Sequence, residues 1–208
     1  MSELILTIGH STHSLQRFII LLREHGITAL CDVRSIPYSR VNPQFNREPL
    51  KQTLQQTGIS YVFLGQELGA RTDDPSCYIQ GKVQFDHLAE TELFRKGIER
   101  IREGTKRYRL ALMCAEKDPI ECHRTILVAR QLQALGFAVA HILEDSSIET
   151  HAHALDRLLH KLNLQDQNMF RSREDMIKDA YTIQGERIAY DLTNTKANYY
   201  RMKRGKEI

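Results

Sequence analysis

The 208 residues of this chain are predicted to form an α/β protein. The expected architecture has three layers: a mainly parallel five-stranded sheet with helices on both faces, followed by a C-terminal helical arm. Two observations indicate this class. Short apolar runs alternate with stretches whose apolar residues recur at the helical period, and turn or cap residues separate them. The expected strands span 4–8, 28–33, 61–64, 109–114 and 138–143.

Helical patterns follow most of these strands. Ser14 is a suitable N-cap for a first helix, because apolar residues beginning with Leu15 and Phe18 follow it at helical spacing. Residues 65–87 are rich in Gly, Asp, Pro and Ser and predict a long connection with little helical structure. The remaining helices are expected at 48–56, 91–106, 119–135, 151–162 and roughly 172–192.

The chain is expected to have two parts. Residues 1–162 form the α/β domain, with a pocket at the strand ends, and residues 163–208 comprise a linker near 163–171, a helix and a basic tail. The apolar stripe of the C-terminal helix must pack either on the body of this chain or on a second copy, as a homodimer. That stripe consists of Ile177, Tyr181, Gln184 and Ile188, with Ala180 and Ile183 alongside.

Composition is that of an ordinary globular protein. Hydrophobic residues make up 41% and charged residues 26% of the chain, and the net charge of +3 is too small to indicate a polyanionic partner. The first apolar run is too short for a signal peptide or a membrane span, and four cysteines at unequal spacing do not suggest a disulfide framework. We therefore expect a cytoplasmic protein with no membrane contact.

Candidate catalytic and binding side chains are most closely spaced in residues 110–124, LALMCAEKDPIECHR. An apolar strand ends at Cys114, a short polar loop follows, and a helix is expected to begin at Pro119, capped by Asp118 with Glu121 completing a capping box. Such a helix N-terminus lowers the pKa of a nearby thiol and attracts anions. The acidic residues of the loop, including Glu116, would compete with an anionic ligand.

Three strands end in loops that carry functional side chains. The first ends in Gly9-His10-Ser11, the second in Asp32-Val33-Arg34 and the fourth in Cys114-Ala115-Glu116. Because the carboxyl ends of parallel strands share one edge of a sheet, where ligands bind in open α/β folds, these loops are expected to converge.

Each candidate catalytic residue has a competing structural interpretation. Cys114 is the candidate nucleophile, or else a buried thiol that completes a strand. His10 is the candidate acid/base, or a cap bonded to local backbone. Asp32 either orients His10 or Arg34, or simply forms a structural ion pair with Arg34. Glu116 is a candidate second proton carrier.

Arginines form most of the predicted substrate-binding set, because a guanidinium suits bidentate recognition of phosphate or carboxylate. Ser11 offers a hydroxyl to an anion, although a local turn bond explains it equally well. The full set is Gly9, Ser11, Arg34, Arg71, His123 and Arg124.

Cofactor and metal signals are weak. Cys122 lines up with apolar helix positions and should face the core; Cys31 should also be buried, whereas Cys77 is expected to be an exposed loop thiol. The spacing of Cys114, Cys122 and His123 matches none of the strong zinc patterns, and no Gly-rich dinucleotide or phosphate loop is present. We predict neither a metal nor a cofactor.

The combined motifs resemble the domain-of-unknown-function 488 family. The resemblance rests on Gly9-His10-Ser11, Asp32-Val33-Arg34, Leu64-Gly65-x-x-Leu68-Gly69, Cys114-Ala115-Glu116 with Cys122-His123-Arg124, and Ala180-Tyr181-x-x-Gln184-Gly185-x-x-Ile188-Ala189-Tyr190. It spans most of residues 4–190 and implies a compact α/β domain with a shared site built from these motifs. Ala70 departs from the family, whose members often have a second glycine there.

The leading functional hypothesis is an enzyme, a hydrolase or transferase, acting on a phosphate-bearing or otherwise anionic substrate such as a nucleotide or nucleic acid. One alternative is a binding module for anions or nucleic acid that performs no chemistry. Another is a metal-dependent hydrolase.

A basic tail closes the chain. Residues 192–208 contain five basic residues and one acidic residue, beside Tyr199 and Tyr200. Aromatic and cationic side chains together are typical of single-stranded nucleic-acid surfaces, although a solvated tail has the same composition.

Overall fold

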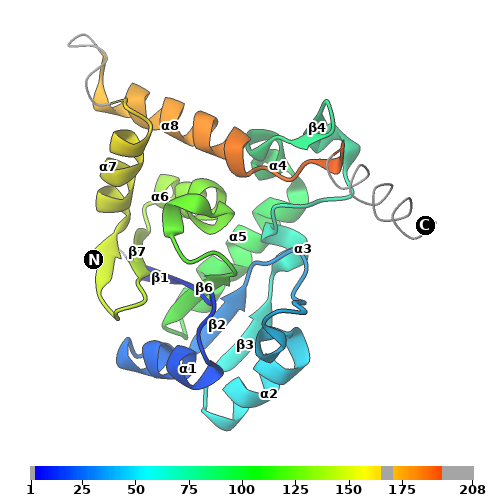
Figure 1. The fold of residues 1–208 in the computed structure, drawn as a ribbon, viewed down its shortest axis with the longest axis vertical. Helices are drawn as coiled ribbons and strands as arrows, with labels where there is room; N and C mark the ends of the chain where they lie inside the picture. The colour runs from blue at the N-terminus through cyan, green and yellow to red at the C-terminus, as the bar shows by residue number, and fades with distance from the viewer. Residues whose placement is uncertain (1–2, 165–170, 194–208) are drawn as a thin grey trace, which may run out of the picture.

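A parallel sheet organises the chain, which a computed structural model describes over residues 3–164 and 171–193. Within these residues the main sheet has six strands in the order β3-β2-β6-β1-β7-β8 (Figure 1). Their bounds are β1 Leu4–Gly9, β2 Ala29–Asp32, β3 Ser60–Phe63, β6 Leu110–Cys114, β7 Ala138–Ile142 and β8 Ile148–Thr150. The α/β class and the mainly parallel sheet are confirmed.

The predicted strand count is wrong by one, because β8 adds an antiparallel edge beside β7. A tight turn causes this return: Leu143 N donates to Ser147 O over 2.9 Å, and Ser146 adopts a left-handed φ of 74°. A turn of this kind reverses the chain without a crossover helix. The six-stranded sheet is therefore mixed.

Two groups of helices cover the two faces of the sheet. Helices α1 (Leu15–Glu24) and α2 (Arg47–Gln56) bury their apolar residues in one core cluster with one face of the strands. The other face packs in a second cluster with α5 (Glu92–Thr105) and α7 (His151–Lys161). The predicted cap of α1 is present, since Ser14 Oγ accepts from Arg17 N at 3.1 Å.

Residues 65–87 are more ordered than the predicted long connection. They form α3 (Gly65–Leu68), the 3₁₀ turn η2 (Pro75–Cys77), the hairpin of β4 (Tyr78–Ile79) with β5 (Lys82–Val83), and the start of α4 (Phe85–Glu90). The prediction of an exposed Cys77 is also wrong. The hairpin and α4 pack against the core cluster that includes Cys77, so its side chain is fully buried.

The predicted continuous helix at 119–135 is wrong. Asp118 caps only a 3₁₀ turn, η3 (Pro119–Glu121), and Cys122 is extended with φ −134° and ψ 141°. A π-helical segment, η4 (Arg124–Ala129), follows and leads into α6 (Arg130–Ala134). Breaks of this kind occur frequently at functional sites, because they redirect side chains out of the helical path.

The C-terminal helix α8 (Arg173–Ile188) crosses from α7 toward α4 (Figure 1). Its stripe packs on the body of the same chain: Tyr181 and Gln184 are buried, and Gln184 Nε2 donates to Ile120 O over 2.9 Å. Residues 165–170 of the predicted linker and residues 194–208 of the predicted basic tail lie outside the described residues.

No helix in the described ranges is both long and apolar enough to cross a lipid bilayer.

Buried histidines connect α8 to the sheet and make stability depend on pH. Thr7 donates its hydroxyl proton toward His141 Nδ1 (2.8 Å), His141 Nε2 contacts His151 Nδ1 (3.1 Å), and Tyr181 Oη lies 2.8 Å from His151 Nε2. Burial lowers the pKa of His151 from 6.5 to about 4. His151 therefore binds a proton more weakly in the folded state than in the unfolded chain. Its contribution to the free energy of unfolding is complete above pH 6.5 and is lost as the pH falls toward 4.

We expect the free energy of unfolding of the wild type to fall between pH 7 and pH 4.5. His151→Gln keeps hydrogen-bonding atoms but removes the titration, and should reduce that fall by about 2–3 kcal/mol. Urea unfolding at both pH values measures it, with the exposed His160→Gln as control. An equal fall in wild type and H151Q would contradict this assignment.

Candidate functional site

Three adjacent strands bring the predicted loops together. In the parallel register Gly9 pairs with Cys114 and Asp32 pairs with Met113, so the ends of β1, β6 and β2 lie side by side. A cavity of about 520 Å³ opens at this edge. Five predicted site residues line it: Arg34, Arg71, Cys114, Glu116 and His123. Gly9, His10, Ser11, Asp32 and Arg124 are not among its lining residues.

The loop after β6 is clamped from two sides. A Cβ at Gly9 would lie 1.9 Å from the carbonyl oxygen of Glu116, so only glycine permits this approach. From the other side the buried Arg124 donates to Glu116 O (2.7 Å) and Lys117 O (3.2 Å). Ser11 N adds a hydrogen bond of 2.9 Å to Ala115 O. These residues position the loop.

Two cysteines, a histidine and a carboxylate lie close together, and all but Cys122 line the cavity. Cys114 Sγ lies 3.6 Å and Cys122 Sγ 3.9 Å from His123 Nδ1, and the Cys122 thiol donates to Glu116 Oε2 over 2.9 Å. The other ring nitrogen, His123 Nε2, donates to Val33 O at 3.0 Å. One donor atom from each of these four residues lies within 4.8 Å of the others, so they could hold a metal ion. We call these four residues the thiol cluster.

Burial and mutual contacts shift the pKa values of the thiol cluster residues in different directions. Burial, the Cys122 thiol and the Glu116 carboxylate raise the pKa of Cys114. Burial opposes charge on Cys122 too, but contacts with Cys114, Arg124 and His123 outweigh it and lower that pKa. Burial and Cys122 raise the pKa of Glu116. The raised pKa values favour the protonated, neutral forms of Cys114 and Glu116.

Asp32 and Arg34 form a buried ion pair, of which Arg34 lines the cavity. Arg34 Nε donates to Asp32 Oδ1 (2.9 Å), and its NH2 nitrogen donates to Asp32 Oδ2 (2.6 Å) and Phe45 O (2.8 Å). Tyr61 Oη donates to Asp32 Oδ2 over 2.7 Å. The carboxylate is fully buried and Arg34 is 6% exposed.

His10 extends this ion pair. Its Nδ1 donates to Ser11 O (3.0 Å), which leaves Nε2 to accept from Arg34 NH1 over 3.1 Å. The ring stacks on Phe45 with centroids 4.4 Å apart. Burial and the neighbouring Arg34 charge lower the pKa of His10 to about 4. The imidazole is therefore neutral near pH 7, with both nitrogens engaged.

Arg71 stands at the rim of the cavity. Its guanidinium lies over the Tyr190 ring, 4.2 Å from the centroid, and its backbone N–H donates to Ser35 Oγ. Glu121, which also lines the cavity, pairs with Lys161 Nζ at 2.5 Å.

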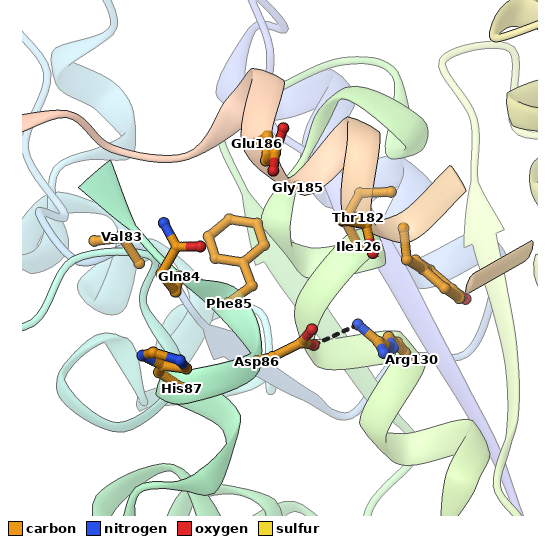
Figure 2. A pocket seen from close by; sticks show the side chains of 11 residues that line it. Val83, Gln84, Phe85, Asp86, His87, Ile126, Arg130, Thr182, Gly185 and Glu186 are labelled. Carbon is orange, nitrogen blue, oxygen red and sulfur yellow. Dashed lines mark hydrogen bonds and ion pairs between the residues drawn. The ribbon is translucent and has the colours of Figure 1, made fainter. Parts of the chain in front are cut away.

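A smaller cavity of about 130 Å³ lies between α4, η4 and α8 (Figure 2). Arg130 NH1 pairs there with Asp86 Oδ1 at 2.7 Å, and the Arg130 guanidinium lies over the Tyr181 ring. Its lining includes no residue of the thiol cluster. The strand-end cavity is therefore the better candidate site.

Sequence reasoning missed several participants. Cys122 is buried in the core as predicted, and its extended backbone also brings Sγ to the thiol cluster, which the sequence did not indicate. The adjacent Cys-His pair was the signal that could have identified it. Tyr61 carries no local signal, because strand pairing places it near Asp32. Tyr190 belongs to the C-terminal motif of the family resemblance, but that motif does not indicate its contact with Arg71.

Fold and site together define an α/β protein with cysteine, histidine and carboxylate side chains at the C-terminal edge of a parallel sheet. The chain belongs to the family described as domain of unknown function DUF488, which matches residues 14–131. That span includes the thiol cluster, whereas Gly9-His10-Ser11 and the α8 motif lie outside it. No curated protein and no solved structure matches the chain.

Proposed function

We propose that this protein is an enzyme, a hydrolase or transferase, that acts on a small anionic substrate in the strand-end cavity. The observation that carries the proposal is the convergence of Cys114, Glu116 and His123 with Arg71 around one cavity of about 520 Å³. A pocket of this size, partly apolar and with few convergent polar groups, is typical of small-molecule sites.

Glu116 is the proposed proton carrier. Burial and its contact with Cys122 raise the pKa of its carboxyl. A carboxyl whose pKa is raised toward the operating pH exchanges protons more effectively. In this proposal His10, with both ring nitrogens engaged, positions Arg34 rather than exchanging a proton with substrate.

Arg71 is the proposed anion contact. Arg34 and Arg124 are committed to Asp32 and to the Glu116 loop, so Arg71 is the cavity arginine best placed to meet a ligand. Stacking on Tyr190 holds its guanidinium plane, which suits bidentate contact with phosphate. A nucleoside monophosphate fits this description in size and charge.

The test separates binding from turnover. Arg71→Met should weaken AMP binding about tenfold, because a hydrogen bond to a charged group contributes about 1.5 kcal/mol or more. Glu116→Gln should slow turnover about 100-fold with little effect on AMP affinity. Calorimetry with AMP measures the first, and release of p-nitrophenol from p-nitrophenyl phosphate or acetate measures the second.

Arg107→Met is the matched control, because Arg107 is exposed and does not line the cavity. It should leave AMP binding unchanged. Binding of AMP that depends on Arg71, with no turnover of either ester, would instead establish a binding module. Equal AMP binding by R71M and wild type would overturn the proposed anion contact.

A further inference from the structure

The distances between the thiol cluster atoms are close to those between the ligands of a tetrahedral zinc ion. A tetrahedral zinc ion binds sulfur at about 2.3 Å and nitrogen at about 2.0–2.1 Å, which separates a sulfur ligand from a nitrogen ligand by about 3.5–3.6 Å. The observed distances from His123 Nδ1 to Cys114 Sγ and Cys122 Sγ are 3.6 and 3.9 Å. We propose that Cys114, Cys122 and His123 bind a zinc ion.

The surrounding contacts are those expected of a metal site. A histidine that ligates a metal nearly always donates its other ring N–H to a carbonyl or carboxylate, which fixes the tautomer. His123 Nε2 makes this bond to Val33 O at 3.0 Å, so the lone pair of Nδ1 faces the sulfurs. The backbone N–H of Arg124 donates to Cys122 Sγ over 3.5 Å, which stabilises a thiolate.

The backbone break explains why the ligand spacing differs from standard zinc motifs. One ligand ends strand β6, and the other two are consecutive residues between η3 and η4. The extended conformation of Cys122 allows neighbouring side chains to reach the same point, which a continuous helix would not. A Cys-x-x-Cys turn is therefore unnecessary here.

The proposed zinc retains an open position toward the cavity. Cys114, Glu116 and His123 line that cavity, and three protein ligands plus one water are the arrangement of catalytic zinc, with Cys₂His among the known sets. Two thiolates and soft donors also favour zinc over magnesium or calcium. This role rests on the proposed function; metal binding itself does not.

The proposed reaction at the zinc is hydrolysis, with water as the second reactant. Zinc binding releases the protons of both thiols. A water on the zinc would give a proton to Glu116, and the resulting hydroxide would form a bond to the electrophilic substrate atom. Glu116 would return the proton to the leaving group as the bond between that atom and the leaving group breaks. One water is consumed, and no electrons are transferred.

Zinc content is the first test. Wild-type protein purified with zinc should contain about one zinc ion per chain, and Cys122→Ser should reduce its zinc affinity by more than about tenfold. Cys31→Ser is the matched control, because Cys31 is also buried in the same core but lies outside the thiol cluster. Circular dichroism verifies that each variant folds.

A second measurement does not depend on variants. Cobalt substituted into the wild type should show sulfur-to-cobalt charge transfer and the strong visible bands of tetrahedral cobalt. Zinc should protect Cys114 and Cys122 from alkylation, and a chelator should reverse the protection. Wild type that binds neither metal, or that holds these thiols as a disulfide, overturns the zinc site.

The outcomes also separate this inference from the proposed function. Stoichiometric zinc without turnover or AMP binding refutes the proposed function and supports the zinc site. Full turnover by wild type that binds no zinc refutes the zinc site and supports the proposed function.

Discussion

Replacing Asp32 by asparagine should lower the free energy of unfolding by about 3–5 kcal/mol, because it leaves the buried Arg34 charge without its partner. The carboxylate accepts from two side-chain nitrogens and the backbone N–H of Arg34, and from Tyr61 Oη. Asparagine presents an NH₂ group to one of these donors. Urea unfolding at pH 7 measures the loss.

Two further variants separate the effect of the unpaired Arg34 charge from the loss of a hydrogen bond. Tyr61→Phe removes one hydrogen bond to the same carboxylate and should cost only about 1–2 kcal/mol. The double variant Asp32→Asn with Arg34→Met should be less destabilised than the sum of its single variants, because no isolated charge remains. Additive losses, or a D32N variant as stable as Y61F, would show that the ion pair is not the dominant interaction.

Replacing Gly9 by alanine should have the second large effect, about 3 kcal/mol of destabilisation. The added Cβ would lie 1.9 Å from Glu116 O and 2.9 Å from its carbonyl carbon, both backbone atoms. Relief requires the loop after Cys114 to move, so AMP binding and zinc content should fall in parallel. Thermal unfolding and both binding assays measure this result.

Gly58→Ala is the control for glycine replacement. Gly58 has a φ of +78° and open space around its Cβ position, so alanine there costs about 1–2 kcal/mol of backbone strain and should leave both ligands bound. A G9A variant that folds and retains zinc and AMP affinity would contradict the close approach between β1 and the Glu116 loop.

The sequence predicted those strands that are buried along their whole length. Parallel strands buried on both faces must be apolar throughout, and the runs that became β1 and β6 carry that signal. Strand β8 carries none, because a turn at Ser146 and pairing with β7 create it. The order of residues 65–87 likewise depends on packing against a core that is distant in sequence.

The sequence predicted where the site lies better than it predicted the role of each residue in it. Strand ends in a parallel sheet meet, so the loops after β1, β2 and β6 could be expected beside one another. The Asp32–Arg34 ion pair was one of the two interpretations that the sequence offered, whereas no local pattern indicates that Arg124 holds the Glu116 loop. Nor could helical periodicity anticipate the extended Cys122, since the break at that residue is what redirects its sulfur.

Crystallography with anomalous scattering at the zinc absorption edge tests the central claim most directly. The account predicts one anomalous peak about 2.3 Å from both Cys114 Sγ and Cys122 Sγ and about 2.0–2.1 Å from His123 Nδ1, with a water on the side of Glu116. Crystals grown with zinc that show no peak between these three atoms, with the thiols free or joined in a disulfide, would contradict it.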